Sequence, residues 1–312
     1  METKIAVIGA GSIGAALGEI LKKRNGLEVE FWDSDQSKMP VWKPVADVVA
    51  GAEFIFLCVP SWELRNAAEE ISPHLASGAV VVSLTKGLEE KTLKTADEVL
   101  KEVLPKDSVM CILGGPMLSG ELKKGNIGVA VAAIKNEIEF LKIKNLLSGM
   151  NVFLEYSNDV HGVALVGVLK NVYAFGLGVI DALELGNNFK GWWVQKSLQE
   201  MARMISDLGG NGKTALDVAG LGDLVATGFS NNSKNFRSGQ EFVKTGKCLL
   251  KGEGFVSLPL VFELLKKDFK NYPLLVSLRS IVIDCAEPKG RLLDLIKNNL
   301  LLTTRIRSGR VC

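Results

Sequence analysis

The sequence is poor in the residues from which metal sites and disulfides are built. It has two histidines and five cysteines in 312 residues, with no CxxC pair and no His/Cys/carboxylate cluster at ligand spacing. Because a metal site needs several such ligands close together, we expect no metal. The cysteines are scattered, at Cys58, Cys111, Cys248, Cys285 and Cys312. This pattern favours buried free thiols and a reducing compartment.

The chain also lacks a surplus of charge of either sign. It carries 37 basic and 35 acidic residues, a net charge of +2, which gives no reason to expect nucleic acid or a membrane surface as a partner. There is no cationic leader followed by an apolar run. The most apolar stretch, residues 162–178, is interrupted by Lys170, so it falls short of the roughly 18 uninterrupted apolar residues of a membrane span. We expect a cytoplasmic protein without a membrane span.

A glycine-rich segment opens the chain. The sequence "KIAVIGAGSIGAALGEILKKR" places a buried apolar run, Ile5 to Ile8, before Gly9, Gly11 and Gly14, and a helical pattern after them. Gly9 permits a tight turn, Gly11 lets a pyrophosphate approach the backbone, and Gly14 lets helix and strand pack closely. The helix N-terminus would hold the phosphates. This context predicts a dinucleotide site, with a plain glycine turn as the alternative.

An acidic residue follows at the spacing that such sites use. The second strand pattern, "LEVEFWD", ends in Asp33, roughly 20 residues beyond the glycines, where a carboxylate bonds the ribose 2′-hydroxyl and repels a 2′-phosphate. We therefore predict NAD as cofactor, with NADP as the alternative. A solvated acid at the end of a strand is the other interpretation of Asp33.

Strand and helix patterns alternate up to residue 157 and then give way to long helices. Alternation of this kind predicts an α/β, Rossmann-like, doubly wound parallel sheet over residues 1–157, and residues 158–312 are predicted to form an all-α domain. Only about 20 residues separate Asp33 from Glu53, so we expect a truncated third strand there because a full βα unit needs more chain. Residues 162–178 have no polar face, which predicts a central, fully buried helix.

Lys170 stands at the midpoint of that apolar helix. A buried lysine without partners is costly, so it is either held by an ion pair or used as an acid. Asp223, in "AGLGDLVAT", is the carboxylate that we pair with it, although an N-cap aspartate is an alternative. Since His74 and His161 both occur in settings typical of structural residues, we assign proton transfer to Lys170. Lys86, in "SLTKGLEE", would stabilise the carbonyl oxygen or hold the substrate, unless it is a surface loop lysine.

The segment "SNNSKNFRSG" suggests an anion cradle. Asn231 or Asn232 can cap a helix that starts near Ser233, which would place Ser233, Lys234 and Asn235 on the first turn. Free backbone N–H groups, a lysine and small polar side chains suit a phosphate. A capped helix with a solvated lysine is the alternative.

These motifs together resemble the NAD(P)-dependent sn-glycerol-3-phosphate dehydrogenase family. The resemblance rests on "GAGSIG", "CVPS", "TKGLE", "GGPMLSGE", "LKNVYAFGLG", "GNNFKG", "GLGDLVAT", "SNNSKN" and "GEG", in the family's order over about residues 4 to 260. It implies reversible reduction of dihydroxyacetone phosphate to glycerol 3-phosphate for glycerolipid synthesis, and a homodimer. Other possibilities are a dehydrogenase of the same architecture for another small hydroxy compound, and a non-catalytic NAD-binding protein.

The resemblance also implies roles for single residues. It makes Lys170 the proton acceptor, with Lys86 and Asp223 beside it as catalytic residues. The expected cofactor residues are Gly9, Gly11, Ser12, Ile13, Gly14, Asp33, Pro60, Lys86, Ser119, Lys234 and Glu253. The expected substrate residues are Lys86, Gly115, Lys170, Asn171, Asp223, Thr227, Ser233, Lys234 and Asn235.

The sequence departs from the family pattern near the expected substrate. Lys234 stands where the family usually has an arginine, which keeps the charge but loses the bidentate fork, and Arg237 is a candidate to compensate. Phe189 occupies a segment in which the family carries an acid and a hydroxyl, and Met117 stands where a small hydroxyl residue is common.

Overall fold

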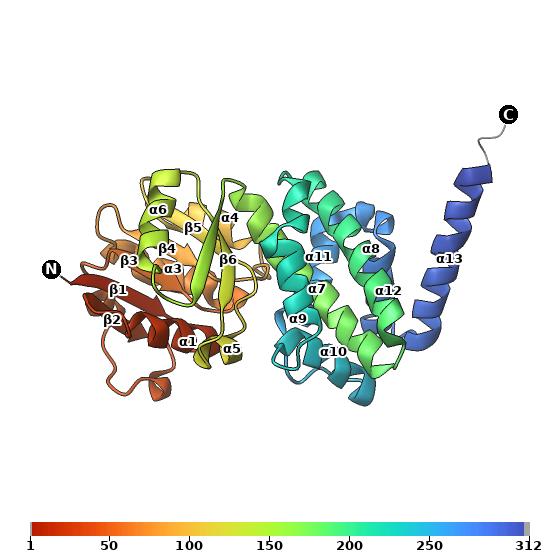
Figure 1. The fold of residues 1–312 in the computed structure, drawn as a ribbon, viewed down its shortest axis with the longest axis horizontal. Coiled ribbons are helices and arrows are strands. Elements are labelled where there is room, and N and C mark those ends of the chain that lie inside the picture. The colour runs from red at the N-terminus through yellow and green to blue at the C-terminus, as the bar shows by residue number, and fades with distance from the viewer. Residues whose placement is uncertain (1, 309–312) are drawn as a thin grey trace.

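The first half of the chain forms one seven-stranded sheet with helices on both faces (Figure 1). The computed structural model describes residues 2–308, apart from the side chains of residues 267 and 299–308. The strands are β1 (Thr3–Ile8), β2 (Leu27–Trp32), β3 (Phe54–Leu57), β4 (Val80–Ser83), β5 (Val109–Gly114), β6 (Gly128–Ala133) and β7 (Val152–Ser157). The helices of this half are α1 (Ser12–Leu21), α2 (Val45–Val49), α3 (Leu64–Ile71), α4 (Ala96–Val103), α5 (Ser119–Lys123) and α6 (Glu137–Leu146).

Strand β1 shows why the sheet must be covered on both faces. Successive side chains of a strand point to opposite faces, and here all of residues 5–8 are buried. Ile5 and Val7 pack in the core that includes residues of α1 and α6. Ala6 and Ile8 pack in the other core, with residues of α2, α3 and α4. The apolar run that predicted a doubly covered strand is confirmed.

The strand order is β2-β1-β3-β4-β5-β6-β7. All neighbouring pairs are parallel except β5 and β6, which run antiparallel. The expected sheet is therefore confirmed as mostly parallel. The connection between β5 and β6 carries only the five-residue α5, and an antiparallel pairing needs no crossover helix along the sheet.

The truncated third strand expected between Asp33 and Glu53 is wrong. This segment contains a 3₁₀ turn at Gln36–Lys38 and the short helix α2, and β2 is left as the edge of the sheet. The chain must pass from β2 across β1 to reach β3 on its other side, and a twenty-residue connection that makes this crossing has no length left for another strand.

The second half of the described chain is helical (Figure 1). Its helices are α7 (Val160–Ala182), α8 (Gly186–Asp207), α9 (Asp223–Gly228), α10 (Lys234–Thr245), α11 (Glu253–Leu265), α12 (Pro273–Val282) and α13 (Pro288–Ser308). A short π-helical turn at Val218–Gly222 leads directly into α9. The predicted boundary between residues 157 and 158 falls in the connection between β7 and α7.

Helix α7 is the core of this half, as the absence of a polar face predicted. It is long and apolar enough to cross a membrane, yet its whole apolar window is buried inside the protein. Close packing around it depends on glycine. A Cβ on Gly178 would lie 2.0 Å from the carbonyl oxygen of Phe236 in α10, so any side chain there would push the two helices apart.

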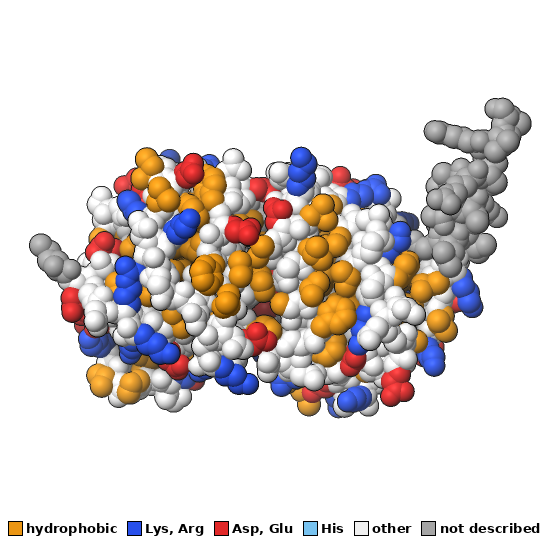
Figure 2. Space-filling view, in the orientation of Figure 1, with side chains coloured by type: hydrophobic (Ala, Val, Ile, Leu, Met, Phe, Trp, Pro, Cys, Tyr) orange, Lys and Arg blue, Asp and Glu red, His pale blue; other side chains and the backbone are white. Residues whose placement is uncertain are grey.

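The surface carries charges of both signs, and Cys58, Cys111, Cys248 and Cys285 are free thiols. Acidic and basic side chains are interspersed over the face in Figure 2, without a large area of one sign. Cys58 and Cys111 are buried free thiols as expected, but Cys285 is free and exposed, because it lies in the loop after α12. Cys312 lies outside the described residues.

Candidate active site

The glycine loop has the geometry that phosphate binding requires. Gly9 has a φ of +99°, and a Cβ there would lie 2.7 Å from the carbonyl oxygen of Cys58. A Cβ on Gly11 would meet nothing within 4 Å, so its absence leaves open space in front of the backbone. Gly11 is also the N-cap of α1, and no side chain caps this helix. The first N–H groups of α1 are therefore available to an anion.

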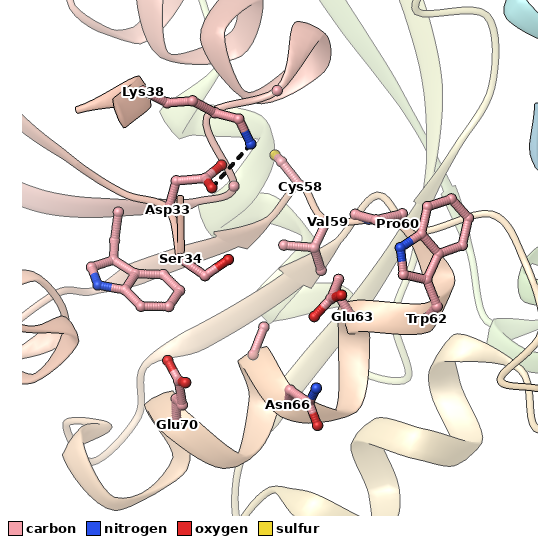
Figure 3. Close-up of a pocket in the computed structure, with 14 residues that line it drawn as sticks. Asp33, Ser34, Lys38, Cys58, Val59, Pro60, Trp62, Glu63, Asn66 and Glu70 are labelled. Carbon is pink, nitrogen blue, oxygen red and sulfur yellow. Dashed lines mark hydrogen bonds and ion pairs between the residues drawn. The ribbon is translucent and has the colours of Figure 1, made fainter. Parts of the chain in front are cut away.

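A cavity of about 310 Å³ opens beside this loop (Figure 3). Gly9, Gly11, Asp33 and Pro60 line it, as expected for cofactor residues. Trp32, Ser34, Lys38, Trp62, Glu63, Asn66 and Glu70 are among the other lining residues. A cavity with Gly11, the N-cap of α1, and the strand-terminal carboxylate of Asp33 in its lining fits the phosphate and ribose parts of a dinucleotide.

Asp33 is more heavily engaged than the sequence indicated. Its Oδ2 accepts a hydrogen bond from the backbone N–H of Ala10 at 2.8 Å, and its Oδ1 accepts one from the N–H of Asp35 at 2.9 Å. The Nζ of Lys38 lies 3.1 Å from Oδ1. The carboxylate thus ties β2 to the glycine loop. Lys38 is a cavity residue that the sequence analysis missed, and its only signal was a basic residue shortly after the acid.

Lys170 does pair with Asp223, as predicted. Lys170 projects from the middle of α7 and is 4% exposed, and its Nζ lies 3.0 Å from Oδ2 of Asp223, the first residue of α9. The Lys170 ammonium also donates to Oγ1 of Thr227 at 3.0 Å, and that hydroxyl donates to Oδ1 of Asp223 at 2.9 Å. Asp223 is therefore neither an N-cap nor an isolated acid.

Lys86 reaches the same carboxylate from the sheet half of the chain. Its Nζ donates to Oδ2 of Asp223 at 2.6 Å and to the carbonyl oxygen of Gly115 at 3.0 Å. Lys86 follows β4 and Gly115 follows β5, so both come from the carboxyl ends of parallel strands, where ligands of such sheets bind. The interpretation of Lys86 as a surface loop lysine is wrong, since its side chain is 20% exposed and paired.

The electrostatics of this cluster favour proton transfer near neutral pH. Burial lowers the pKa of Lys170 to about 8, a shift that Asp223 opposes and Lys86 reinforces. Burial raises the pKa of Asp223, but the two lysines outweigh burial and hold that pKa below its usual value. An ionised carboxylate next to a lysine that titrates close to neutrality is the arrangement expected of an acid–base site.

A chain of amide hydrogen bonds links Lys86, in the sheet half, to the helical half. The side-chain amide of Asn171 donates to the carbonyl oxygen of Lys86 at 3.0 Å, and its Oδ1 accepts from Asn235 at 2.7 Å. Oδ1 of Asn235 in turn accepts from the backbone N–H of Gly254 at 2.9 Å. Both asparagines are buried. These contacts fix the position of Lys86 relative to α7, α10 and α11.

Glu253 makes a second contact between the helical half and the sheet half. This first residue of α11 accepts from the backbone N–H of Ser61 and from its Oγ, both at 3.0 Å. Burial raises the pKa of Glu253 in spite of these bonds and the charge of Lys234. Ser61, next to the cavity residue Pro60, was missed because its partner lies 192 residues away.

The helix of the expected anion cradle, α10, has a different N-cap from the one predicted. Ser233 is the N-cap of α10, with its side chain accepting from the N–H of Phe236, and α10 begins at Lys234. The expected cap by Asn231 or Asn232 is wrong, because Ser233 directly precedes the first helical residue. Lys234 is exposed at the start of α10.

The remaining expected residues lie apart from the cavity lining. Ser12 and Ile13 begin α1, Gly14 is buried behind Gly9, and Ser119 begins α5. Of the departures from the family pattern, Phe189 is buried, with its ring 5.6 Å from that of Trp192. The Phe189 side chain therefore packs in the helical core. Arg237, the candidate to compensate for Lys234, is exposed on α10.

Neither histidine belongs to this site. His161 contacts Asp97 at 3.2 Å and the carbonyl oxygen of Leu208 at 3.2 Å, where it joins α4 to the start of α7. His74 ends a 3₁₀ turn after α3. Within residues 2–308, no group of three or more His, Cys, Asp and Glu side chains is arranged to hold a metal ion.

The fold and the site define a nicotinamide-dependent oxidoreductase, with a dinucleotide loop in the sheet half of the chain and a buried lysine–carboxylate cluster where the sheet half and the helical half meet. Family profiles described as the N-terminus and the C-terminus of NAD-dependent glycerol-3-phosphate dehydrogenase match residues 39–139 and 159–292. The chain belongs to the NAD-dependent glycerol-3-phosphate dehydrogenase family.

Individual relatives agree with this assignment. A glycerol-3-phosphate dehydrogenase [NAD(P)+] of Dehalococcoides mccartyi is 30% identical, with 92% of this chain and 89% of the relative covered. One from Ectopseudomonas mendocina is 35% identical, with 75% of each chain covered. The crystal structure of glycerol-3-phosphate dehydrogenase from Coxiella burnetii matches with a TM-score of 0.85 and 25% identity, over 95% of this chain and 99% of that one.

Proposed function

We propose that the protein transfers hydride between NAD(P)H and dihydroxyacetone phosphate, and so supplies sn-glycerol 3-phosphate for glycerolipid synthesis. The observation that carries the proposal is the Lys170–Asp223–Lys86 cluster between the cofactor domain and the helical domain. When bound, the nicotinamide would give hydride to the carbonyl carbon during reduction or take it during oxidation. Gly9, Gly11 and Asp33 would hold the dinucleotide in the cavity that they line.

Lys170 is proposed as the acid of the reduction. Its ammonium has three N–H groups, and within the described residues its acceptors are Asp223 and Thr227, which leaves one N–H for the substrate. As hydride arrives at the carbonyl carbon, this N–H gives its proton to the carbonyl oxygen. In the oxidation, the neutral amine takes the hydroxyl proton back.

The other residues of the cluster orient the reacting groups. Asp223 and Thr227 hold the Lys170 amine in one position. Lys86, fixed by Gly115 and Asn171, would bring a second positive charge to the side of the carbonyl oxygen. Ser233, Lys234 and Asn235, at the start of α10, would bind the substrate phosphate, with free N–H groups and an exposed ammonium as the support.

A single variant tests this assignment. Lys170→Ala should lower turnover of dihydroxyacetone phosphate by roughly 10²- to 10⁴-fold, the range of a lost general acid, while NADH binding, followed by fluorescence, stays unchanged. Lys190→Ala removes a lysine that pairs with Asp181 outside the cluster and should keep full activity. Substantial turnover by Lys170→Ala would contradict the proposed role.

A second candidate is a dehydrogenase of the same architecture for another small hydroxy compound. Lys234 favours it, since an ammonium binds phosphate without the bidentate geometry of arginine. Assays of dihydroxyacetone phosphate, dihydroxyacetone and short keto acids with NADH distinguish the two. A preference for an unphosphorylated compound would establish the second candidate, and binding of NADH without any turnover would favour a non-catalytic protein.

We also propose that residues 1–157 and 158–312 are the two domains and that the enzyme is a cytoplasmic homodimer. The position of residue 157 at the end of β7 supports the division, and the family resemblance supports the dimer. Light scattering during size-exclusion chromatography tests it: a monomeric mass would contradict the dimer.

A further inference from the structure

We propose that Lys38, together with Ser34, forms a subsite for the 2′-phosphate of NADP(H), and that Lys38 sets the ratio between NADPH and NADH affinity. Four observations on this chain carry the proposal, and all concern the end of the cavity where β2 stops. The proposal deepens the cofactor part of the proposed function and leaves the substrate assignment untouched.

The first observation is the position of the ammonium. Lys38 lines the cavity next to Asp33, and Figure 3 shows its Nζ directed towards the Asp33 carboxylate from the segment that follows β2. In dinucleotide-binding sheets, the residue at this strand end meets the ribose 2′ position. A bound dinucleotide would therefore bring its ribose 2′ position, where NAD and NADP differ, close to this cation.

The second observation is that Lys38 keeps capacity for another partner. Its contacts are Oδ1 of Asp33 at 3.1 Å and Oδ2 of Asp35 at 3.7 Å, and its side chain is 45% exposed. An ammonium has three N–H donors. A lysine used only to neutralise a buried acid would be enclosed, whereas this one faces the cavity and water.

The third observation is that both carboxylate oxygens of Asp33 are already engaged by hydrogen-bond donors. Both carboxylate oxygens accept hydrogen bonds from backbone N–H groups, of Ala10 and Asp35, before Lys38 is counted. The repulsion that an acid at this position exerts on a 2′-phosphate is therefore reduced. Ser34, which directly follows Asp33, also lines the cavity and adds a hydroxyl donor.

The fourth observation concerns the other charges that face the cavity. Glu63 and Glu70 line it from the segment of α3 and the turn before it, and Figure 3 shows them across the cavity from Asp33 and Lys38. Among the cavity-lining residues, Lys38 is the one cation. Its removal would leave three carboxylates and no positive charge for a 2′-phosphate to approach.

The test measures binding and needs no turnover. Dissociation constants of NADH and NADPH are measured by nucleotide fluorescence for the natural sequence, Lys38→Met, Lys38→Arg and Lys43→Met. Lys43 lies in the same connection but pairs with Glu30 outside this cavity, so it is the matched control. The probes 2′,5′-ADP and 5′-ADP, used as competitors of NADH, repeat the comparison without nicotinamide.

Lys38→Met should weaken NADPH and 2′,5′-ADP roughly tenfold, the effect of one lost charge-assisted hydrogen bond, and leave NADH and 5′-ADP unchanged. Lys38→Arg should retain NADPH binding, and Lys43→Met should change nothing. Equal weakening of all four nucleotides, or of none, would overturn the subsite. The natural sequence distinguishes this failure from failure of the proposed function: if it binds NADH, the cofactor site exists and only the subsite is overturned, whereas absence of NADH binding by the natural sequence would overturn the proposed function as well.

Discussion

The strongest prediction concerns the carboxylate that lies between the two lysines. Asp223→Asn keeps the shape of the side chain but removes the negative charge 3.0 Å from the Lys170 ammonium. An opposite charge at such a distance shifts a pKa by about 1–3 units. The pKa of Lys170, about 8 in the intact site, should therefore fall to about 6 in the variant, because burial and the charge of Lys86 then act without opposition.

The consequence for the rate follows from the fraction of protonated lysine. At pH 7 that fraction falls from about nine tenths to about one tenth when the pKa moves from about 8 to about 6. Reduction of dihydroxyacetone phosphate needs the protonated form, so kcat/KM at pH 7 should fall roughly tenfold and its alkaline limb should move to lower pH. Oxidation of glycerol 3-phosphate needs the neutral amine, so its acid limb should move in the same direction.

The assay is the pH profile of kcat/KM for both directions, followed by NADH absorbance. Asp181→Asn is the control, since Asp181 pairs with Lys190 and Gln240 away from the cluster. If the alkaline limb of the reduction stays at the same pH in Asp223→Asn, Asp223 does not tune Lys170 and the mechanism is refuted.

Two further predictions concern other buried carboxylates. Ser61→Ala removes one of two hydrogen bonds to Glu253. Because Ser61 follows the cavity residue Pro60, this change should weaken NADH binding about fivefold, the effect of about 1 kcal/mol. An unchanged dissociation constant of NADH, measured by fluorescence, would show that this contact does not support the cofactor cavity. Burial raises the pKa of Glu200 from 4.5 to about 7, although Leu274 and Tyr173 donate hydrogen bonds to it. The folded protein therefore binds the proton of the Glu200 carboxyl more tightly than the unfolded chain does. The contribution of this proton to the free energy of unfolding is fully present below pH 4.5 and is lost as the pH rises through 7. Glu200→Gln should flatten the melting temperature between those pH values, and a profile parallel to that of the natural protein would contradict the shift.

The sequence determined those features that depend on near neighbours. The glycine loop, the apolar strand before it and the helix after it follow from residues within one short segment. Helix α7 follows in the same way from a stretch without a polar face, and Lys170 was conspicuous within it because a charge among apolar residues demands a partner. The pairing of Lys170 with Asp223 was predicted by matching one buried charge to another.

Only the tertiary structure decided which distant segments meet. It placed Lys86, which follows β4, beside the carboxylate of Asp223, 137 residues further on, and it joined Glu253 in the helical half to Ser61 in the sheet half. It also replaced the expected third strand by a short helix and turned Lys38 towards Asp33. Residues close together in the sequence determine periodicity and capping. Contacts between residues far apart in the sequence depend on how the sheet and the helices pack, and no local pattern predicts that packing.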